Sequence, residues 1–145
     1  MTKIIADTTS GLPLELVHKL GIAMIPQQVI FEEHAYRDDT GISTAEFLNK
    51  LKNSAELPKT AAPLPVMYTP VFAEAAKNGE TCLVIAPSSK ISGTCRSAET
   101  ARMDFPGADI RIIETQTVAG CLGTKYDRLF DGLGNPWSPK NPKFD

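Results

Sequence analysis

The sequence predicts an α/β fold built around a parallel sheet. Three short apolar runs have the length of buried strands: "KIIAD" at 3–7, "TCLVIA" at 81–86 and "ADIRIIET" at 108–115. Segments with apolar residues at helical spacing separate these runs along the chain. Because parallel strands need crossover connections of this kind, we expect a Rossmann-like sheet with helices on both faces.

The first helix and the extended segment after it have clear sequence boundaries. Pro13 suits the first turn of a helix, and apolar residues at helical spacing continue to Gly21, which is typical of a helix end. The residues 22–31 then form a second extended segment, which Pro26 interrupts.

A capping box predicts where the second helix begins. Ser43 is followed three residues later by Glu46, so we expect Ser43 to cap a helix that begins at Thr44. The preceding residues, 32–41, are interpreted as a polar turn. After this helix we expect a loop rich in Pro and Thr at 56–70, a short helix at 71–79 and a helix at 92–105.

Composition excludes several classes of function. The chain has 145 residues, a formal net charge of −2 and scattered Lys and Arg, so no basic surface for nucleic acid is indicated. No apolar run reaches the length of a transmembrane segment. The dispersed Cys82, Cys95 and Cys121 favour a reducing, cytoplasmic location. Because His18 and His34 lie at no ligand spacing from a cysteine, we expect no metal site.

Two turns rich in hydroxyl groups follow predicted strands. They are "DTTSG" at 7–11 and "PSSKISGT" at 87–94, and ligands of open α/β sheets bind beyond the carboxyl ends of the strands. Ser92 and Thr94 offer O–H groups beside a helix N-terminus, where anions are favoured, and Gly93 permits close approach of the backbone. The turn therefore indicates a carboxylate or phosphate site, with helix capping by Ser92 as the alternative.

The remaining candidates have plainer interpretations. Asp7 at a strand end suits a catalytic acid or a metal ligand, but such a residue more often accepts backbone N–H groups in a turn. Asp38 and Asp39 lie beside Arg37 and are interpreted as a solvated turn. Cys95 is interpreted as a packing residue, because its motif holds no histidine or second cysteine to lower its pKa.

Four blocks in this order resemble the DegV family of bacterial proteins. The first is "ADTTSGLP" at 6–13, and the last is "SSKISGTCRSA" at 88–98. Between them lie a Y-x-D…IS-x-x-x-F block and a P-x-T loop, carried here by Tyr36, Asp38, Ile42, Ser43, Phe47, Pro58, Thr60 and Pro63. The resemblance covers residues 3–123 and is specific, because four ordered blocks coincide.

The resemblance implies a lipid carrier and not an enzyme. Members of the family hold one long-chain fatty acid, and some present it to a fatty acid kinase. Their ligand carboxylate is held by hydroxyls of the Thr loop and the SGT turn, which correspond here to Thr60 and Ser92, with Gly93 and Thr94 alongside. The resemblance implies no cofactor besides the bound fatty acid.

Two other functions remain open on the residues alone. A small Rossmann-like transferase would bind a phosphate at the SGT turn, and a remnant would keep the fold without binding anything. We expect one domain of this family at 1–124, with the family's second domain absent. Residues 125–145, which are rich in Pro and Gly and lack periodicity, are expected to form an irregular tail, either loosely packed or produced by truncation.

Overall fold

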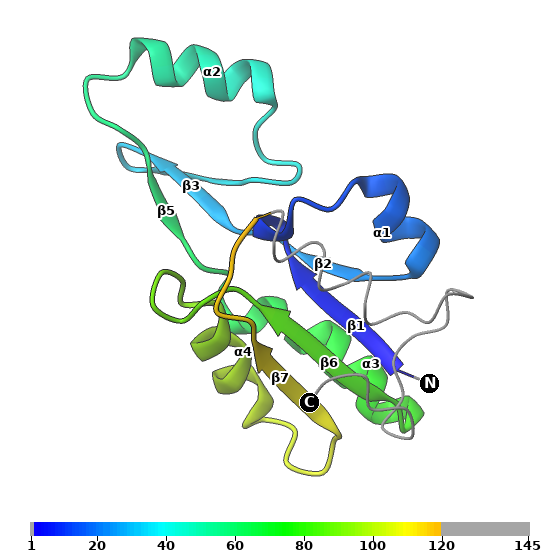
Figure 1. Ribbon diagram of the computed structural model, residues 1–145. Coiled ribbons are helices and arrows are strands. Elements are labelled where there is room, and N and C mark those ends of the chain that lie inside the picture. The colour runs from blue at the N-terminus through cyan, green and yellow to red at the C-terminus, as the bar shows by residue number, and fades with distance from the viewer. Residues whose placement is uncertain (1, 120–145) are drawn as a thin grey trace.

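The computed structural model describes residues 2–119, and its centre is a parallel sheet of four strands (Figure 1). In spatial order the strands are β2 (Ala23–Ile25), β1 (Thr2–Asp7), β6 (Thr81–Ala86) and β7 (Ile110–Glu114). Every neighbouring pair in this sheet is parallel. The predicted α/β class and the predicted parallel arrangement are therefore confirmed.

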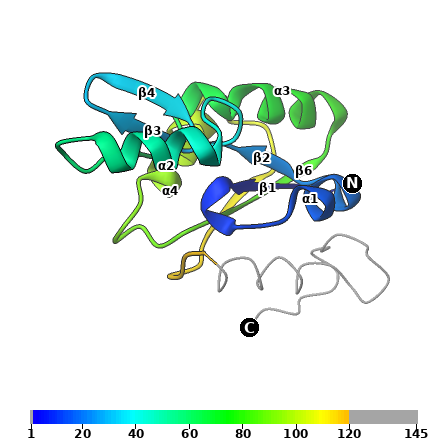
Figure 2. The same cartoon turned by 90° about the horizontal axis from the view of Figure 1, so that it is seen from above.

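Helices cover both faces of this sheet, as the sequence predicts (Figure 2). On one face α3 (Thr69–Asn78) and α4 (Thr94–Arg102) pack against Ile5 and Val84. On the other face α1 (Leu14–Leu20) packs against the adjacent strand residues, including Leu83. Because successive side chains point to opposite faces, a strand covered on both sides must be apolar throughout, which explains runs such as "CLVIA".

A second, antiparallel sheet corrects two sequence expectations. It consists of β4 (His34–Arg37), β3 (Gln28–Phe31) and β5 (Lys59–Ala61), in that order. The polar turn expected at 32–41 therefore contains a strand, and so does the loop expected at 56–70. A two-residue hairpin usually shows Asn-Gly or Asp-Gly, whereas Glu32 and Glu33 make this one, with Glu32 at a φ of 53°.

The second helix, α2 (Thr44–Asn53), begins where the capping box predicts. The backbone N–H of Ser43 donates to Glu46 Oε2 at 2.9 Å, and the backbone N–H of Glu46 donates to Ser43 Oγ at 3.2 Å. The helix lies over the small sheet, where the rings of Phe47 and Phe31 meet edge to face with centroids 5.7 Å apart.

Removing this cap should destabilise the protein measurably. We expect Ser43→Ala to lower the free energy of unfolding by about 1 kcal/mol, because one N–H of the first helical turn loses its acceptor. The neighbouring Thr44→Ala is the matched control, since Thr44 is exposed and should change stability by less than about 0.5 kcal/mol. Equal urea midpoints for the two variants would contradict the assignment of the cap.

Two short 3₁₀ helices, η1 (Thr8–Ser10) and η2 (Pro65–Met67), complete the described elements. Among residues 2–119 there is no helix long and apolar enough to cross a membrane. The expectation of an irregular tail at 125–145 falls outside the described residues.

Candidate functional site

The candidate site lies where both sheets meet, beyond the carboxyl ends of the parallel strands (Figure 1). A pocket of about 160 Å³ is bordered by the segments that leave the four strands. Thr9 follows β1, Gln27 follows β2, Pro87 follows β6 and Val118 follows β7. β1 contacts β2 on one side and β6 on the other, and crevices of this kind are where open α/β sheets bind ligands.

The lining of the pocket is divided between polar and apolar groups. The polar lining consists of Thr9, Gln27, Gln28, Asp38, Thr60 and Ser92, and the apolar lining consists of Val29, Pro87, Ile91 and Val118. Ile91 is 67% exposed and Val118 is 41% exposed, so the apolar lining continues to the protein surface. The pocket therefore suits a polar head group attached to an apolar chain.

Thr60 and Ser92 line this one pocket although they lie 32 positions apart in the sequence. β5 pairs with β3 so that Thr60 lies opposite Val29, another lining residue. Ser92 lies in the turn before α4, and the backbone N–H of Ser92 donates to the Ser88 carbonyl at 3.0 Å. The structure thus brings together the two hydroxyl residues that the sequence analysis singled out.

Gly93 and Thr94 lie next to the pocket but do not line it. Gly93 precedes the first residue of α4, and a Cβ placed there would lie 3.3 Å from the Cβ of Ala62. Glycine therefore allows the Thr60 segment to approach the turn closely. Thr94 is 1% exposed, and its hydroxyl donates to Asp7 within the protein.

Asp7 is the buried acceptor that organises this region. It is 1% exposed. Its Oδ2 accepts from Thr94 Oγ1 at 2.8 Å and from Gln27 Nε2 at 2.7 Å, while its Oδ1 accepts from the backbone N–H of Thr9 at 3.2 Å. The turn interpretation of Asp7 is confirmed, and the same carboxylate also joins the ends of β1 and β2 to the start of α4.

This network fixes the orientation of the Ser92 hydroxyl. Thr94 Oγ1 gives its only hydrogen to Asp7, so in the 2.9 Å contact between the two hydroxyls Ser92 must be the donor. Ser92 Oγ also accepts weakly from the backbone N–H of Thr94 at 3.3 Å. The alternative that Ser92 caps the helix is wrong, because Gly93 occupies the N-cap position and no side chain caps α4.

Asp38 differs from the solvated turn that the sequence analysis predicts. It lines the pocket, and both of its carboxyl oxygens accept from Thr8 Oγ1, at 2.8 and 2.6 Å. Burial raises the pKa of Asp38, an effect that the hydrogen bond from Thr8 opposes and the nearby charge of Asp39 reinforces. Asp38 is therefore a half-buried acidic group of the pocket.

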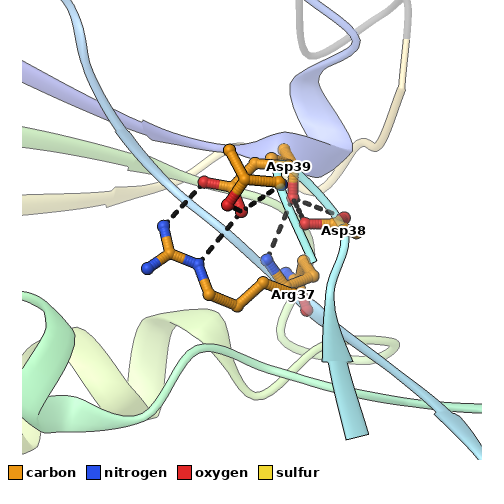
Figure 3. A network of polar contacts seen from close by, with 6 residues as sticks. Arg37, Asp38 and Asp39 are labelled. Atoms are coloured by element: carbon orange, nitrogen blue, oxygen red, sulfur yellow. Dashed lines mark hydrogen bonds and ion pairs between the residues drawn. The ribbon is translucent and has the colours of Figure 1, made fainter. Parts of the chain in front are cut away.

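Asp39, in contrast, fits the solvated turn. Its carboxylate receives two hydrogen bonds from the Arg37 guanidinium, at 3.0 and 2.7 Å. Figure 3 shows the guanidinium directed at Asp39, with Asp38 on the other side of the turn. The hydrogen bond from Arg37 is the main cause that lowers the pKa of Asp39. Arg37 therefore neutralises the carboxylate outside the pocket, and no cation among residues 2–119 is hydrogen-bonded to Asp38.

The turn that carries Ser92 is fixed to β7. Glu114 Oε1 accepts from the backbone N–H of Ser89 at 2.9 Å and from its hydroxyl at 2.8 Å. The backbone N–H of Ser88 donates to the Thr117 carbonyl at 3.0 Å. Of the hydroxyl residues in "SSKISGT", only Ser92 therefore lines the pocket, while Ser88, Ser89 and Thr94 bind protein groups.

The structure also bears on the interpretation of Cys95. Burial is the main cause that raises the pKa of the Cys95 thiol, and its sulfur lies 3.8 Å from the Pro87 carbonyl oxygen. The buried position of Cys95 confirms that it is a packing residue. Within residues 2–119, no group of three or more His, Cys, Asp or Glu side chains is placed to hold a metal ion.

Gln27 is a residue of the site that sequence reasoning missed, whereas Thr8 and Thr9 belong to the hydroxyl-rich turn at 7–11 that the sequence indicated. Gln27 is 7% exposed and joins Asp7 to Thr94 through its side-chain amide, while its backbone N–H donates to Thr8 Oγ1 at 3.0 Å. The available signal was local: Pro26 ends β2, and two glutamines then follow inside an otherwise apolar segment. A buried glutamine at such a break indicates a polar network.

The fold and this pocket define the chain as an α/β protein with a pocket beyond the carboxyl ends of its parallel strands. A family model described as an uncharacterised protein of the DegV family matches residues 1–126, and the chain belongs to the DegV family. A DegV domain-containing protein of Halalkalibacterium halodurans is 38% identical over 113 residues, which are 76% of this chain and 40% of that protein. The chain spans less than half the length of this relative.

Solved structures of related proteins agree with the fold. The structure describing fatty acid binding by a DegV family protein from Thermus thermophilus has a TM-score of 0.79 at 32% identity, over 88% of this chain and 45% of that chain. A stearic acid-binding protein from Eubacterium ventriosum has a TM-score of 0.84 at 25% identity, over 97% of this chain and 50% of that chain. DegV of Bacillus subtilis, a fatty acid binding protein, has a TM-score of 0.76 at 26% identity, over 96% of this chain and 50% of that chain.

Proposed function

We propose that this protein binds a long-chain fatty acid whose carboxyl group lies between Thr60 and Ser92. The observation that carries the proposal is the placement of both hydroxyl residues on one pocket with an exposed apolar border. Related proteins named for fatty acid binding support it, at 32% and 26% identity. Gly93 and Thr94 contribute by shaping the turn and holding the Ser92 hydroxyl, and we propose a carrier, not a catalyst.

The volume of the pocket determines which part of the ligand it holds. A cavity of about 150 Å³ suffices for a molecule the size of benzene, so about 160 Å³ accommodates a carboxyl group and the first carbons of a chain. The rest of the chain would leave over Ile91 and Val118. Each methylene that becomes buried contributes about 0.8 kcal/mol, so affinity depends on how much of the chain is covered.

The described lining offers no cation to the ligand carboxyl, and this suits a carrier that passes its ligand to a second protein. Within residues 2–119, the lining includes no Lys, Arg or His, so nothing described there forms the strong ion pair that an arginine makes with a carboxylate. A carboxyl group held only by hydroxyls keeps an oxygen available to a second reactant. We propose on this ground that the protein presents its fatty acid to a fatty acid kinase in the cytoplasm.

Lipid recovery tests the function against its alternatives. We expect organic extraction of the purified chain to yield a fatty acid in stoichiometric amount by mass spectrometry, because the buried apolar part of such a ligand dissociates slowly. The same extraction from a heat-denatured and refolded sample is the control. A phosphorylated metabolite in place of the lipid would favour the transferase, and an empty protein that takes up no palmitate would favour the remnant.

A further inference from the structure

The pocket contains a carboxyl group of its own at the position where an acidic ligand is proposed to bind. Asp38 shares the pocket lining with Thr60 and Ser92. Its only side-chain donor among the described residues is the Thr8 hydroxyl, whereas a carboxylate has about four lone-pair sites. The backbone N–H groups of Gln27 and Asp38 also act on this carboxyl, and the acceptor capacity that they leave is open to a donor that enters the pocket.

The charged groups around Asp38 do not neutralise it. On its own turn Arg37 is hydrogen-bonded to Asp39, which adds a second negative charge nearby. Across the 3₁₀ segment and β2, the nearest ionisable group along the network is Asp7, another carboxylate. From β5 and the turn before α4, Lys59 and Lys90 are exposed and neither lines the pocket.

Ser92 also favours a ligand that donates a hydrogen bond. Because its hydrogen is donated to Thr94 Oγ1, Ser92 presents lone pairs, and not a donor, to the pocket. An ionised carboxylate would therefore meet an acceptor at Ser92 and a negative charge at Asp38. A protonated carboxyl group would instead supply one hydrogen, which it donates to Asp38 and can share with Ser92 in a three-centre hydrogen bond.

We propose that Asp38 makes this pocket accept its acidic ligand in protonated form, so that the ligand carboxyl and Asp38 share one proton. This inference rests on the proposed function. Two carboxyl groups in one small site cannot both ionise readily, so the pair keeps one proton at a pH where each group alone would lose it. Binding of an ionised fatty acid to ionised Asp38 then takes up one proton from solvent, and the charge balances.

Proton uptake by calorimetry is the direct measurement. Decanoate should be titrated into the protein at pH 8 in buffers of different ionisation enthalpy. We expect nearly one proton to be taken up per ligand bound, and we expect the affinity to fall about tenfold for each pH unit above the pKa values of both free groups. The fall follows because the complex holds a proton that the separate partners have released.

Asp38→Asn removes the second carboxyl while keeping its shape and an oxygen for Thr8. In this variant we expect proton uptake near zero and an affinity independent of pH, since the asparagine N–H donates to the ionised ligand. Asp104→Asn is the matched control, because Asp104 is exposed and does not line the pocket, and it should keep the uptake of the unaltered protein. Binding of 1-decanol, which carries its own hydrogen, should be independent of pH in all three and shows that each pocket is folded.

The outcomes separate this inference from the proposed function. If decanoate binds the unaltered protein with no proton uptake, the shared proton is wrong and the fatty acid site stands. If Asp38→Asn still takes up a full proton, the assignment to Asp38 is wrong. If neither decanoate nor decanol binds between pH 5 and 9, the proposed function itself fails.

Discussion

Thr94→Val should lower the free energy of unfolding by about 2 kcal/mol, although valine has nearly the volume of threonine. The expected loss arises because Asp7 stays buried while the donor 2.8 Å from its Oδ2 is removed, and hydrogen bonds to charged groups contribute about 1.5–3 kcal/mol. Gln27 Nε2 also loses one of its two acceptors, Thr94 Oγ1 at 3.0 Å.

Equilibrium unfolding in urea measures this effect. Thr100→Val is the matched control, because the Thr100 hydroxyl lies on an exposed part of α4 and donates only to the Arg96 carbonyl of the same helix. We expect the control to change stability by less than about 0.5 kcal/mol. A loss at Thr94 no larger than at Thr100 would show that Asp7 does not depend on this donor.

Ser92→Ala should weaken fatty acid binding about tenfold. The substitution removes the hydroxyl contact to the ligand carboxyl, and one hydrogen bond of this kind contributes about 1.4 kcal/mol or more. Stability should change little, because the Thr94 hydroxyl keeps its bond to Asp7. Ser89→Ala is the control, since Ser89 is exposed and its backbone N–H keeps the bond to Glu114.

Displacement of a fluorescent fatty acid by palmitate is a suitable readout for both variants. We expect Ser89→Ala to bind as the unaltered protein does. Unchanged affinity in Ser92→Ala, at unchanged stability, would remove Ser92 from the site and leave Thr60 as the only hydroxyl proposed for the head group.

Periodicity and capping were sufficient to predict three of the four strands of the large sheet and the start of α2. β1, β6 and β7 are apolar runs of strand length, and α2 begins at the residue that its capping box marks. These signals are local, since each depends on a few neighbouring residues. The small sheet was missed because its hairpin has Glu32 where glycine is usual, and because β5 is a three-residue strand stabilised only by pairing with β3.

The site could be predicted only in part, because its residues converge through tertiary structure. The hydroxyl-rich turn at 88–94 indicated a ligand, but no local pattern shows that Ser92 alone would line the pocket. That outcome depends on Asp7, which lies 87 positions from Thr94 and accepts the hydrogen bond that the Thr94 hydroxyl donates. Likewise, Asp38 and Asp39 are adjacent in sequence and differ in role because Arg37 reaches only one of them.

Carbon-13 NMR of carboxyl-labelled palmitate locates the head group of the bound lipid. We expect one narrow carboxyl resonance, shifted from that of the free lipid, in the unaltered protein. We expect this resonance to move in Ser92→Ala and in Thr60→Val but not in Ser89→Ala, because only the first two residues line the pocket. A bound carboxyl resonance that is insensitive to both Ser92 and Thr60 would show that the head group lies elsewhere, and the proposed site would then be wrong.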